Sequence, residues 1–236
     1  MSAKVTVLTT TRQGGVSAPP FDALNLGLHV GDRAESVMEN RRRLQVSFSL
    51  PAEPVWLNQT HGINIVDVTS QPELNTDADG AYTCLTNKVL AVLTADCLPV
   101  VISDVQGTQL AVVHAGWRGL AGGIVKQALK RFNTSAGLYA WLGPAIGPER
   151  FEVGEDVRHA FVQRNAANAE HFVNGQRQGK YYADLYALAR TELADAGCKT
   201  VGGDFCTHTR TDLFHSHRRD GKASGRIATV AWISAV

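Results

Sequence analysis

The sequence lacks any long hydrophobic run. No segment of its 236 residues approaches the roughly 20 consecutive apolar residues that a transmembrane helix requires. Residues 1–15 contain one lysine but no sustained apolar stretch, so we predict no secretory signal. We therefore expect a cytoplasmic protein with no membrane partner.

The sequence also lacks an excess of charge of either sign. Its 23 Lys and Arg residues against 22 Asp and Glu residues give a net charge of +1. Nucleic-acid-binding domains carry a basic patch that neutralises phosphates, so we expect no nucleic-acid partner. The one early basic run, residues 41–43, is interpreted as part of a solvated helix face.

Cysteine is scarce and unpaired in its spacing. The four cysteines, Cys84, Cys97, Cys198 and Cys206, form no C-x-x-C pair. A chain of this length without a secretory signal does not need disulfides, so we expect reduced thiols. Dinucleotide-binding G-x-G-x-x-G and Walker motifs are absent as well, which argues against a doubly wound nucleotide-binding sheet.

Hydrophobic patterning predicts an α+β protein. The runs KVLAVLT, LPVVIS and QLAVVHA are short and rich in β-branched residues, which is typical of three consecutive strands. Asp32 and Glu35 predict a capped helix start, with Val37, Leu44 and Phe48 on its buried side. Further helices are predicted over 155–163 and 183–196. Without a linker or repeat, we expect one mixed-sheet sandwich domain over residues 1–236.

Three soft metal ligands lie at the ends or junctions of predicted strands. His61 follows N-Q-T, Cys97 separates KVLAVLT from LPVVIS, and His114 ends QLAVVHA. Two imidazoles and a thiolate suit zinc and leave a fourth position open, although copper accepts the same donors. Two other interpretations stay open. The residues can be an ordinary buried thiol with two histidines, or a nucleophilic Cys97 with His114 as base and Asp96 or Asp79 orienting it.

A glycine-rich stretch follows His114. G-W-R-G-L-A-G-G, residues 116–123, enters a predicted helix, and glycines there let backbone N–H groups approach an anion. Arg118 adds a planar cation that suits phosphate. The same glycines are equally consistent with tight helix packing. Trp117 is interpreted as a packing residue in preference to a stacking platform for a purine.

Eight motifs occur in order along the chain: T-R-Q-G-G-V-S, L-N-L-G-L-H-V-G-D, N-Q-T-H-G, D-A-D-G, T-A-D-C-L-P-V, H-A-G-W-R-G, L-G-P-A-I-G-P and R-R-D-G…G-R. Together they resemble the bacterial YfiH-type laccase-domain family, also known as polyphenol oxidases or peptidoglycan editing factors. The resemblance covers residues 9–232, nearly the whole chain.

The resemblance implies an α/β/β/α layered sandwich with a metal site formed by His61, Cys97 and His114. It further implies a zinc-dependent purine nucleoside phosphorylase that acts on adenosine, inosine, guanosine and methylthioadenosine, with adenosine deaminase activity. The partners are then a small-molecule nucleoside and phosphate. A copper-dependent polyphenol oxidase and a Cys–His amidase that edits peptidoglycan precursors are the alternatives.

Residue type suggests further substrate- and phosphate-binding positions. Phosphate is expected at Arg12 or Arg118, and a base or hydroxyl-binding role at Asp79 or Asp96. The full set of such candidates is Arg12, Asn25, Gln59, Asp79, Asp96 and Arg118. One departure from the family pattern falls before R-R-D-G, where F-H-S-H replaces F-x-S-Y. His215 and His217 are therefore not expected to be required metal ligands.

Overall fold

The computed structural model describes residues 3–68 and 76–235, and its strands form three sheets. The first sheet has the order β1-β12-β4, with β1 (Ala3–Thr9), β12 (Ile227–Ala235) and β4 (Leu90–Thr94). The second has the order β11-β7-β5-β6-β3-β2, with β11 (Lys199–Gly202), β7 (Leu138–Leu142), β5 (Leu98–Asp104), β6 (Leu110–Ala115), β3 (Gly80–Thr83) and β2 (Ile65–Asp67). The third, small sheet has the order β8-β10-β9, with β8 (Glu152–Gly154), β10 (Lys180–Ala183) and β9 (Phe172–Asn174).

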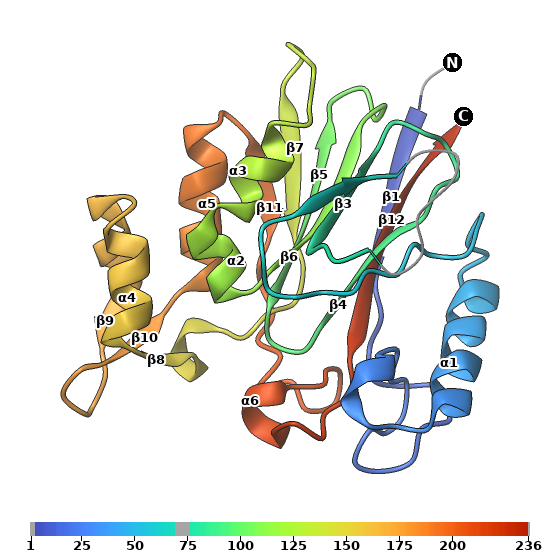
Figure 1. The fold of residues 1–236 in the computed structure, drawn as a ribbon, viewed down its shortest axis with the longest axis horizontal. Coiled ribbons are helices and arrows are strands. Elements are labelled where there is room, and N and C mark those ends of the chain that lie inside the picture. Colours follow the sequence, from blue (N-terminus) through green and yellow to red (C-terminus); the bar gives the residue numbers. More distant parts are fainter. Residues whose placement is uncertain (1–2, 69–75, 236) are drawn as a thin grey trace.

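The helices lie outside the two large sheets (Figure 1). They are α1 (Ala34–Ser47), α2 (Trp117–Gly122), α3 (Ile124–Leu129), α4 (Glu155–Val162), α5 (Leu185–Asp195) and α6 (His217–Asp220), with 3-10 turns η1 (Leu28–Val30), η2 (Pro148–Arg150) and η3 (Ala166–His171). α2, α3 and α5 cover one face of the six-stranded sheet, and α1 lies on the opposite side of the molecule, beside the three-stranded sheet.

Alternation along the strands builds the layers. In β5, Val100 and Ile102 pack toward α3 and α5, whereas Val101 packs toward the three-stranded sheet. In β4, Leu90 and Val92 enter that central core, while Ala91 and Leu93 pack toward Leu44 of α1. Successive side chains of a strand point to opposite faces, so both sheets are buried on two sides. The result is the expected α/β/β/α sandwich.

The three predicted central strands are confirmed as β4, β5 and β6, but they do not lie in one sheet. β5 and β6 pair with each other, whereas β4 pairs with β12 from the other end of the chain. The turn between β4 and β5, residues 95–97, therefore connects the two sheets. Local sequence does not determine which strand enters which sheet, because all three runs have the same apolar, β-branched pattern.

The predicted capping box at the start of α1 is wrong. The N-cap is Arg33, without a side-chain cap, and Asp32 instead accepts hydrogen bonds from Ser17 Oγ and Asn25 Nδ2 at 2.6 and 2.9 Å. Phe48, expected on the buried side, is 50% exposed beyond the end of the helix. Val37 and Leu44 are buried as predicted.

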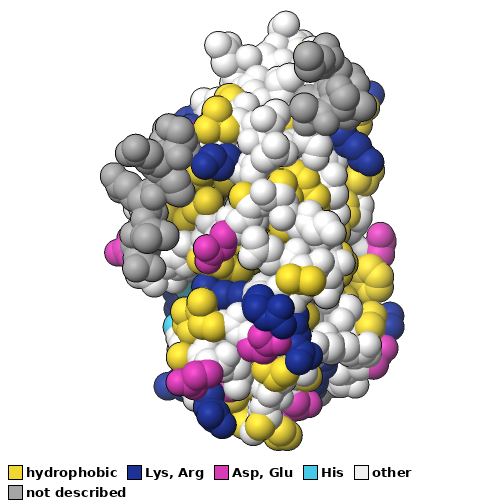
Figure 2. All heavy atoms as spheres, turned by 90° about the vertical axis from the view of Figure 1, so that its right-hand side faces the viewer, with side chains coloured by type: hydrophobic (Ala, Val, Ile, Leu, Met, Phe, Trp, Pro, Cys, Tyr) yellow, Lys and Arg dark blue, Asp and Glu magenta, His cyan; other side chains and the backbone are white. Residues whose placement is uncertain are grey.

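The surface over α1 carries charges of both signs, and Lys and Arg side chains lie beside Asp and Glu side chains on this face (Figure 2). Arg42 and Arg43 both pair with Glu39, at 2.7 and 2.9 Å, as expected for a solvated helix face. Arg41 of the same run departs from this prediction, because it is half-buried over the Trp56 ring and donates to the Leu26 carbonyl oxygen. No helix within residues 3–68 and 76–235 has the length and apolarity needed to cross a bilayer.

Candidate metal site

Strand register brings the predicted ligands together. In the β5–β6 pair, Leu98 lies opposite Ala115 and Pro99 opposite His114, so Cys97 emerges beside Gly116 at the same sheet end. His61 lies in the loop before β2. The ligand atoms of His61, Cys97 and His114 all lie within 4.8 Å of one another. The three candidates from the sequence therefore form one cluster.

Asp79, directly before β3, holds the cluster together. Its side chain is fully buried, and β3–β6 pairing places it next to His114. Its carboxylate accepts hydrogen bonds from the backbone N–H groups of Thr60, His61 and Gly62 at 3.1, 2.9 and 2.7 Å. These bonds fix the loop that carries His61, whose φ of 61° is a left-handed conformation for a non-glycine residue.

The same carboxylate sets the tautomer of His114. His114 Nδ1 lies 2.7 Å from Asp79 Oδ1, and the buried pair leaves Nε2 as the ring nitrogen available to a metal. The His114 ring meets the His61 ring edge to face, with centroids 4.8 Å apart. Although burial acts to raise it, the pKa of Asp79 is lowered to about 2, mainly by the hydrogen bond with His114 and those from the loop. Asp79 is thus an ionised positioning residue.

Electrostatics favour a thiolate at Cys97. Burial acts to raise the pKa of this thiol, but the adjacent His114 and His61 outweigh burial and lower it. Conversely, burial acts to lower the pKa of His114, and the negative charges of Cys97 and Asp79 raise it. A metal cation replaces the protons of such a pair, because a ligating cysteine binds as the thiolate.

The glycines of α2 make room for the cluster. A Cβ atom on Gly116 would lie 3.1 Å from Cys97 Sγ and 3.2 Å from His61 Cδ2. Cβ atoms on Gly119 and Gly122 would lie 2.8 Å from the Gly62 carbonyl oxygen and 2.7 Å from Ile63 Cγ2. These glycines let α2 close onto the loop that follows His61, which supports the packing interpretation. Trp117 also packs against the main core, as predicted.

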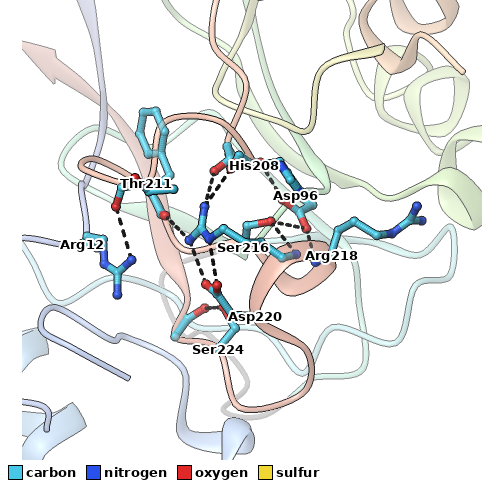
Figure 3. Close-up of polar contacts among 12 residues, drawn as sticks. Arg12, Asp96, His208, Thr211, Ser216, Arg218, Asp220 and Ser224 are labelled. Atoms are coloured by element: carbon cyan, nitrogen blue, oxygen red, sulfur yellow. Dashed lines mark hydrogen bonds and ion pairs between the residues drawn. The ribbon is translucent and has the colours of Figure 1, made fainter. Parts of the chain in front are cut away.

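Asp96, the acid before Cys97, fastens the turn to the C-terminal part of the chain (Figure 3). Its Oδ1 accepts a hydrogen bond from Thr207 Oγ1 at 2.6 Å, and its Oδ2 accepts bonds from Ser216 Oγ at 3.0 Å and the Arg218 backbone N–H at 2.6 Å. Asp96 is buried and has a φ of 85°. Its carboxylate oxygens are thus occupied by the segment around α6, which gives Asp96 an anchoring role.

The remaining candidates lie in different surroundings. Arg12 pairs with Asp22 at 3.2 Å and lies beside the segment around Thr211 (Figure 3). Gln59 bonds both backbone groups of Leu93 in β4, at 2.7 and 2.8 Å. Asn25 is buried, and Arg118 is exposed with its guanidinium 4.4 Å from the Trp117 ring centroid. None of these four is a member of the ligand cluster.

No site role was assigned from the sequence to three basic residues, His29, Arg41 and Arg226. His29 lies in the motif L-N-L-G-L-H-V-G-D and Arg226 in the motif R-R-D-G…G-R, so membership of these motifs was the signal that could have identified them. Of the histidines in F-H-S-H, His215 is fully buried and its two ring nitrogens have no hydrogen-bond partner within the described residues, and His217 is exposed. Neither belongs to the cluster of His61, Cys97 and His114.

A four-layer α+β sandwich with a His–Cys–His cluster at one sheet end, oriented by a buried carboxylate, defines a class of candidate metalloproteins with one open ligand position. The sequence comparison identifies the family. The model of the "Multi-copper polyphenol oxidoreductase laccase" family matches residues 6–234, so the chain belongs to this family.

Relatives and solved structures agree with this assignment. The chain is 46% identical to an Escherichia coli protein named purine nucleoside phosphorylase YfiH, over 97% of this chain and 94% of the relative. It is 43% identical to a Pseudomonas aeruginosa protein named purine nucleoside phosphorylase, over 98% and 94%. A Neisseria meningitidis crystal structure superposes with a TM-score of 0.92 at 41% identity, covering 100% of this chain and 99% of that one. YlmD from Geobacillus stearothermophilus gives a TM-score of 0.85 at 30% identity, covering 99% and 93%.

Proposed function

We propose that this protein is a zinc-dependent purine nucleoside phosphorylase with adenosine deaminase activity, acting on adenosine, inosine, guanosine and methylthioadenosine. The observation that carries the proposal is the cluster of His61, Cys97 and His114, with ligand atoms within 4.8 Å. Relatives at 46% and 43% identity bear the name purine nucleoside phosphorylase, which supports the reaction class.

The donor set fits zinc. One thiolate and two imidazoles are ligands that Zn²⁺ accepts in catalytic sites with a free fourth position. Gly116 leaves the space beside these ligands unfilled, because a side chain there would contact Cys97 and His61. When bound, the metal supplies Lewis-acid polarisation of an oxygen ligand and lowers the pKa of a bound water.

The chain's own residues prepare the site. Asp79 keeps the His114 proton on Nδ1 and fixes the loop of His61, so the ligands are oriented before substrate arrives. In the proposed phosphorolysis, an oxygen of hydrogen phosphate forms a bond to C1′ of the ribose, the bond from C1′ to the purine nitrogen breaks, and the proton given up by the phosphate ends on the released purine. In the proposed deamination, water adds at C6 of adenosine and ammonia leaves.

Product analysis tests the proposal. Zinc-loaded protein is incubated with adenosine, with and without phosphate. Adenine and ribose 1-phosphate that form only with phosphate indicate the phosphorylase, and inosine indicates the deaminase. Cys97→Ala is expected to abolish metal retention and both activities, whereas Cys84→Ala, at an exposed thiol outside the cluster, retains them. Unchanged turnover by Cys97→Ala would contradict the proposal.

A second candidate function is a Cys–His amidase acting on peptidoglycan precursors. It is favoured by the arrangement of three side chains in space: the buried Asp79 carboxylate orients the His114 imidazole, and this imidazole lies beside the Cys97 thiol. Chelation separates the two candidates. Activity on cell-wall amides that survives removal of all metal supports the amidase, and nucleoside turnover that chelation abolishes supports the zinc enzyme.

The name of the family suggests a copper-dependent polyphenol oxidase as another alternative. Electron transfer from phenols to oxygen generally uses several copper ions, and the described cluster provides donors for one ion. Oxygen uptake on phenols after copper loading, lost in His114→Ala, would favour this activity over the nucleoside reaction.

A further inference from the structure

Three basic side chains from distant segments meet beside the metal-ligand cluster. They are His29 in η1, Arg41 on α1 and Arg226 directly before β12. In the β12–β4 pair, Ile227 lies opposite Thr94, so Arg226 lies beside the turn that carries Cys97. The fold thus places positive charge at the metal site from a part of the chain more than 100 residues away from Cys97.

The segment between Leu26 and His29 gathers the three residues. Arg41 donates from Nε and Nη2 to the Leu26 carbonyl oxygen, at 3.1 and 3.0 Å. A Cβ atom on Gly27 would lie 2.8 Å from Arg226 Cγ and 3.4 Å from His29 Cε1, so both side chains pass directly over this glycine. His29, Arg41 and Arg226 therefore form one group.

The guanidinium groups of Arg41 and Arg226 are fixed by hydrogen bonds, and each keeps N–H donors that have no partner within the described residues. Arg226 Nη1 donates to the Ser224 and Gly225 carbonyl oxygens at 2.7 and 3.0 Å, which leaves Nε and Nη2 without a hydrogen bond to the described residues. The Arg41 guanidinium lies 4.0 Å from the Trp56 ring centroid, and its Nη1 is likewise free of hydrogen bonds to described residues. Fixed cations with unused donors are typical of anion sites.

The two arginines of this group have no carboxylate partner within the described residues. Within residues 3–68 and 76–235, no carboxylate lies at ion-pair distance from Arg41 or Arg226, whereas Arg12 and Arg42 each have one. Glu53 acts on Arg41 only from beyond that distance. The Cys97 thiolate acts on Arg226, and so, more weakly, does Asp96, which already accepts three hydrogen bonds.

The charges around His29 are also positive. Partial burial lowers the pKa of His29, and the positive charges of Arg226 and Arg41 lower it further. Burial also lowers the pKa of Arg41, to about 10. Excess positive charge of this kind is relieved by binding an anion.

We propose that His29, Arg41 and Arg226 form an anion-binding site for a phosphate group beside the cluster of His61, Cys97 and His114. This inference rests on the proposed function in naming inorganic phosphate as the anion, because phosphorolysis requires phosphate next to the nucleoside. It assigns the phosphate to residues other than Arg12, which is paired with Asp22, and Arg118, which lies on α2 over Trp117.

Phosphate binding to the zinc-loaded protein, measured by isothermal titration calorimetry, tests the site. Inorganic phosphate and adenosine 5′-monophosphate are titrated separately, so that free phosphate and a phosphate ester are distinguished. Arg226→Gln and His29→Gln are each expected to weaken phosphate binding by ~10- to 100-fold, because the first removes a fixed cation and the second removes an imidazole that can take up a proton beside the anion. Arg226→Lys, which keeps the charge, is expected to recover part of the loss. Tighter binding of the ester than of inorganic phosphate would overturn the assignment to inorganic phosphate.

Arg42→Gln is the matched control. Arg42 is the neighbour of Arg41 on α1 but pairs with Glu39, so its substitution is expected to leave phosphate binding unchanged. Equal phosphate affinity in wild type, Arg226→Gln and His29→Gln would overturn the site, as would an absence of measurable binding to wild type. His29 is exposed, so His29→Gln keeps the test decisive if Arg226→Gln does not fold.

Turnover separates this inference from the proposed function. Phosphate binding that depends on Arg226, without any phosphorolysis of nucleosides, supports the anion site and contradicts the phosphorylase. Phosphorolysis with a KM for phosphate that neither Arg226→Gln nor His29→Gln changes supports the phosphorylase and contradicts the site. With both correct, the two substitutions raise the KM for phosphate and leave the dissociation constant of the nucleoside, measured without phosphate, within about 2-fold of wild type.

Discussion

His215 makes the stability of this protein depend on pH in a way that a single substitution removes. Its side chain is fully buried between Phe214 and Ser216, and neither ring nitrogen has a hydrogen-bond partner within the described residues. A Cβ atom on Gly225 would lie 2.5 Å from its Nε2, so the ring lies flush against the backbone. Burial is the main cause that lowers the pKa of His215, from 6.5 to about 4.

The magnitude follows from linkage. Between pH 6.5 and pH 4 the unfolded chain protonates this histidine and the folded protein does not, so the unfolded state binds more protons and stability falls as the pH falls. Above pH 6.5 the imidazole of His215 is neutral in both the folded and the unfolded state, and its burial then causes no pH-dependent loss of stability. At pH 5 the loss is about 2 kcal/mol, and at full protonation about 3 kcal/mol.

Urea unfolding of wild type and His215→Phe at pH 7.0 and pH 5.0, both free of metal, checks this reasoning. Phenylalanine cannot titrate, so the variant is expected to lose about 2 kcal/mol less than wild type between the two pH values. For each protein, the change in unfolding free energy between pH 7.0 and pH 5.0 is calculated. Comparing these two changes removes the pH-independent effect of altered packing and the effect of carboxylates that titrate in both proteins. His217→Gln, at an exposed position, is expected to keep the wild-type pH dependence. An identical loss in wild type and His215→Phe would refute the assignment of a buried, neutral His215.

Three further predictions concern the metal cluster and the chain as a whole. Asp79→Asn removes the carboxylate that orients His114 and is expected to weaken zinc binding by about 10- to 100-fold in a competition with a chelator, while Asp67→Asn, at an exposed ion pair, has no effect. Gly116→Ala places a methyl group 3.1 Å from Cys97 Sγ, and we expect about 10-fold weaker zinc binding with unchanged circular dichroism. Finally, a single domain over residues 1–236 predicts one urea transition with the same midpoint by fluorescence and by circular dichroism, and separate midpoints would indicate two domains.

Much of the secondary structure and the candidate metal-ligand residues were predictable from local signals. The short, β-branched runs of β4, β5 and β6 favour strands, and the spacing of apolar residues in α5 favours a helix. Soft donors at the junctions of these elements made His61, Cys97 and His114 candidate ligands, and the family resemblance of the ordered motifs implied the same three residues. The start of α1 was mispredicted because Asp32 bonds to Ser17 and Asn25, contacts that no local pattern reveals.

The sequence by itself determined the chemistry available to this protein: one thiolate and two imidazoles, placed at strand ends, beside glycines that leave space for them. Only the tertiary structure decided how that chemistry is arranged. Pairing of β4 with β12 brings Arg226 to the turn of Cys97, and the buried carboxylates of Asp79 and Asp96 become positioning groups through contacts far along the chain. The reason is physical, since apolar periodicity fixes which face of an element is buried, whereas long-range register decides which polar groups then meet.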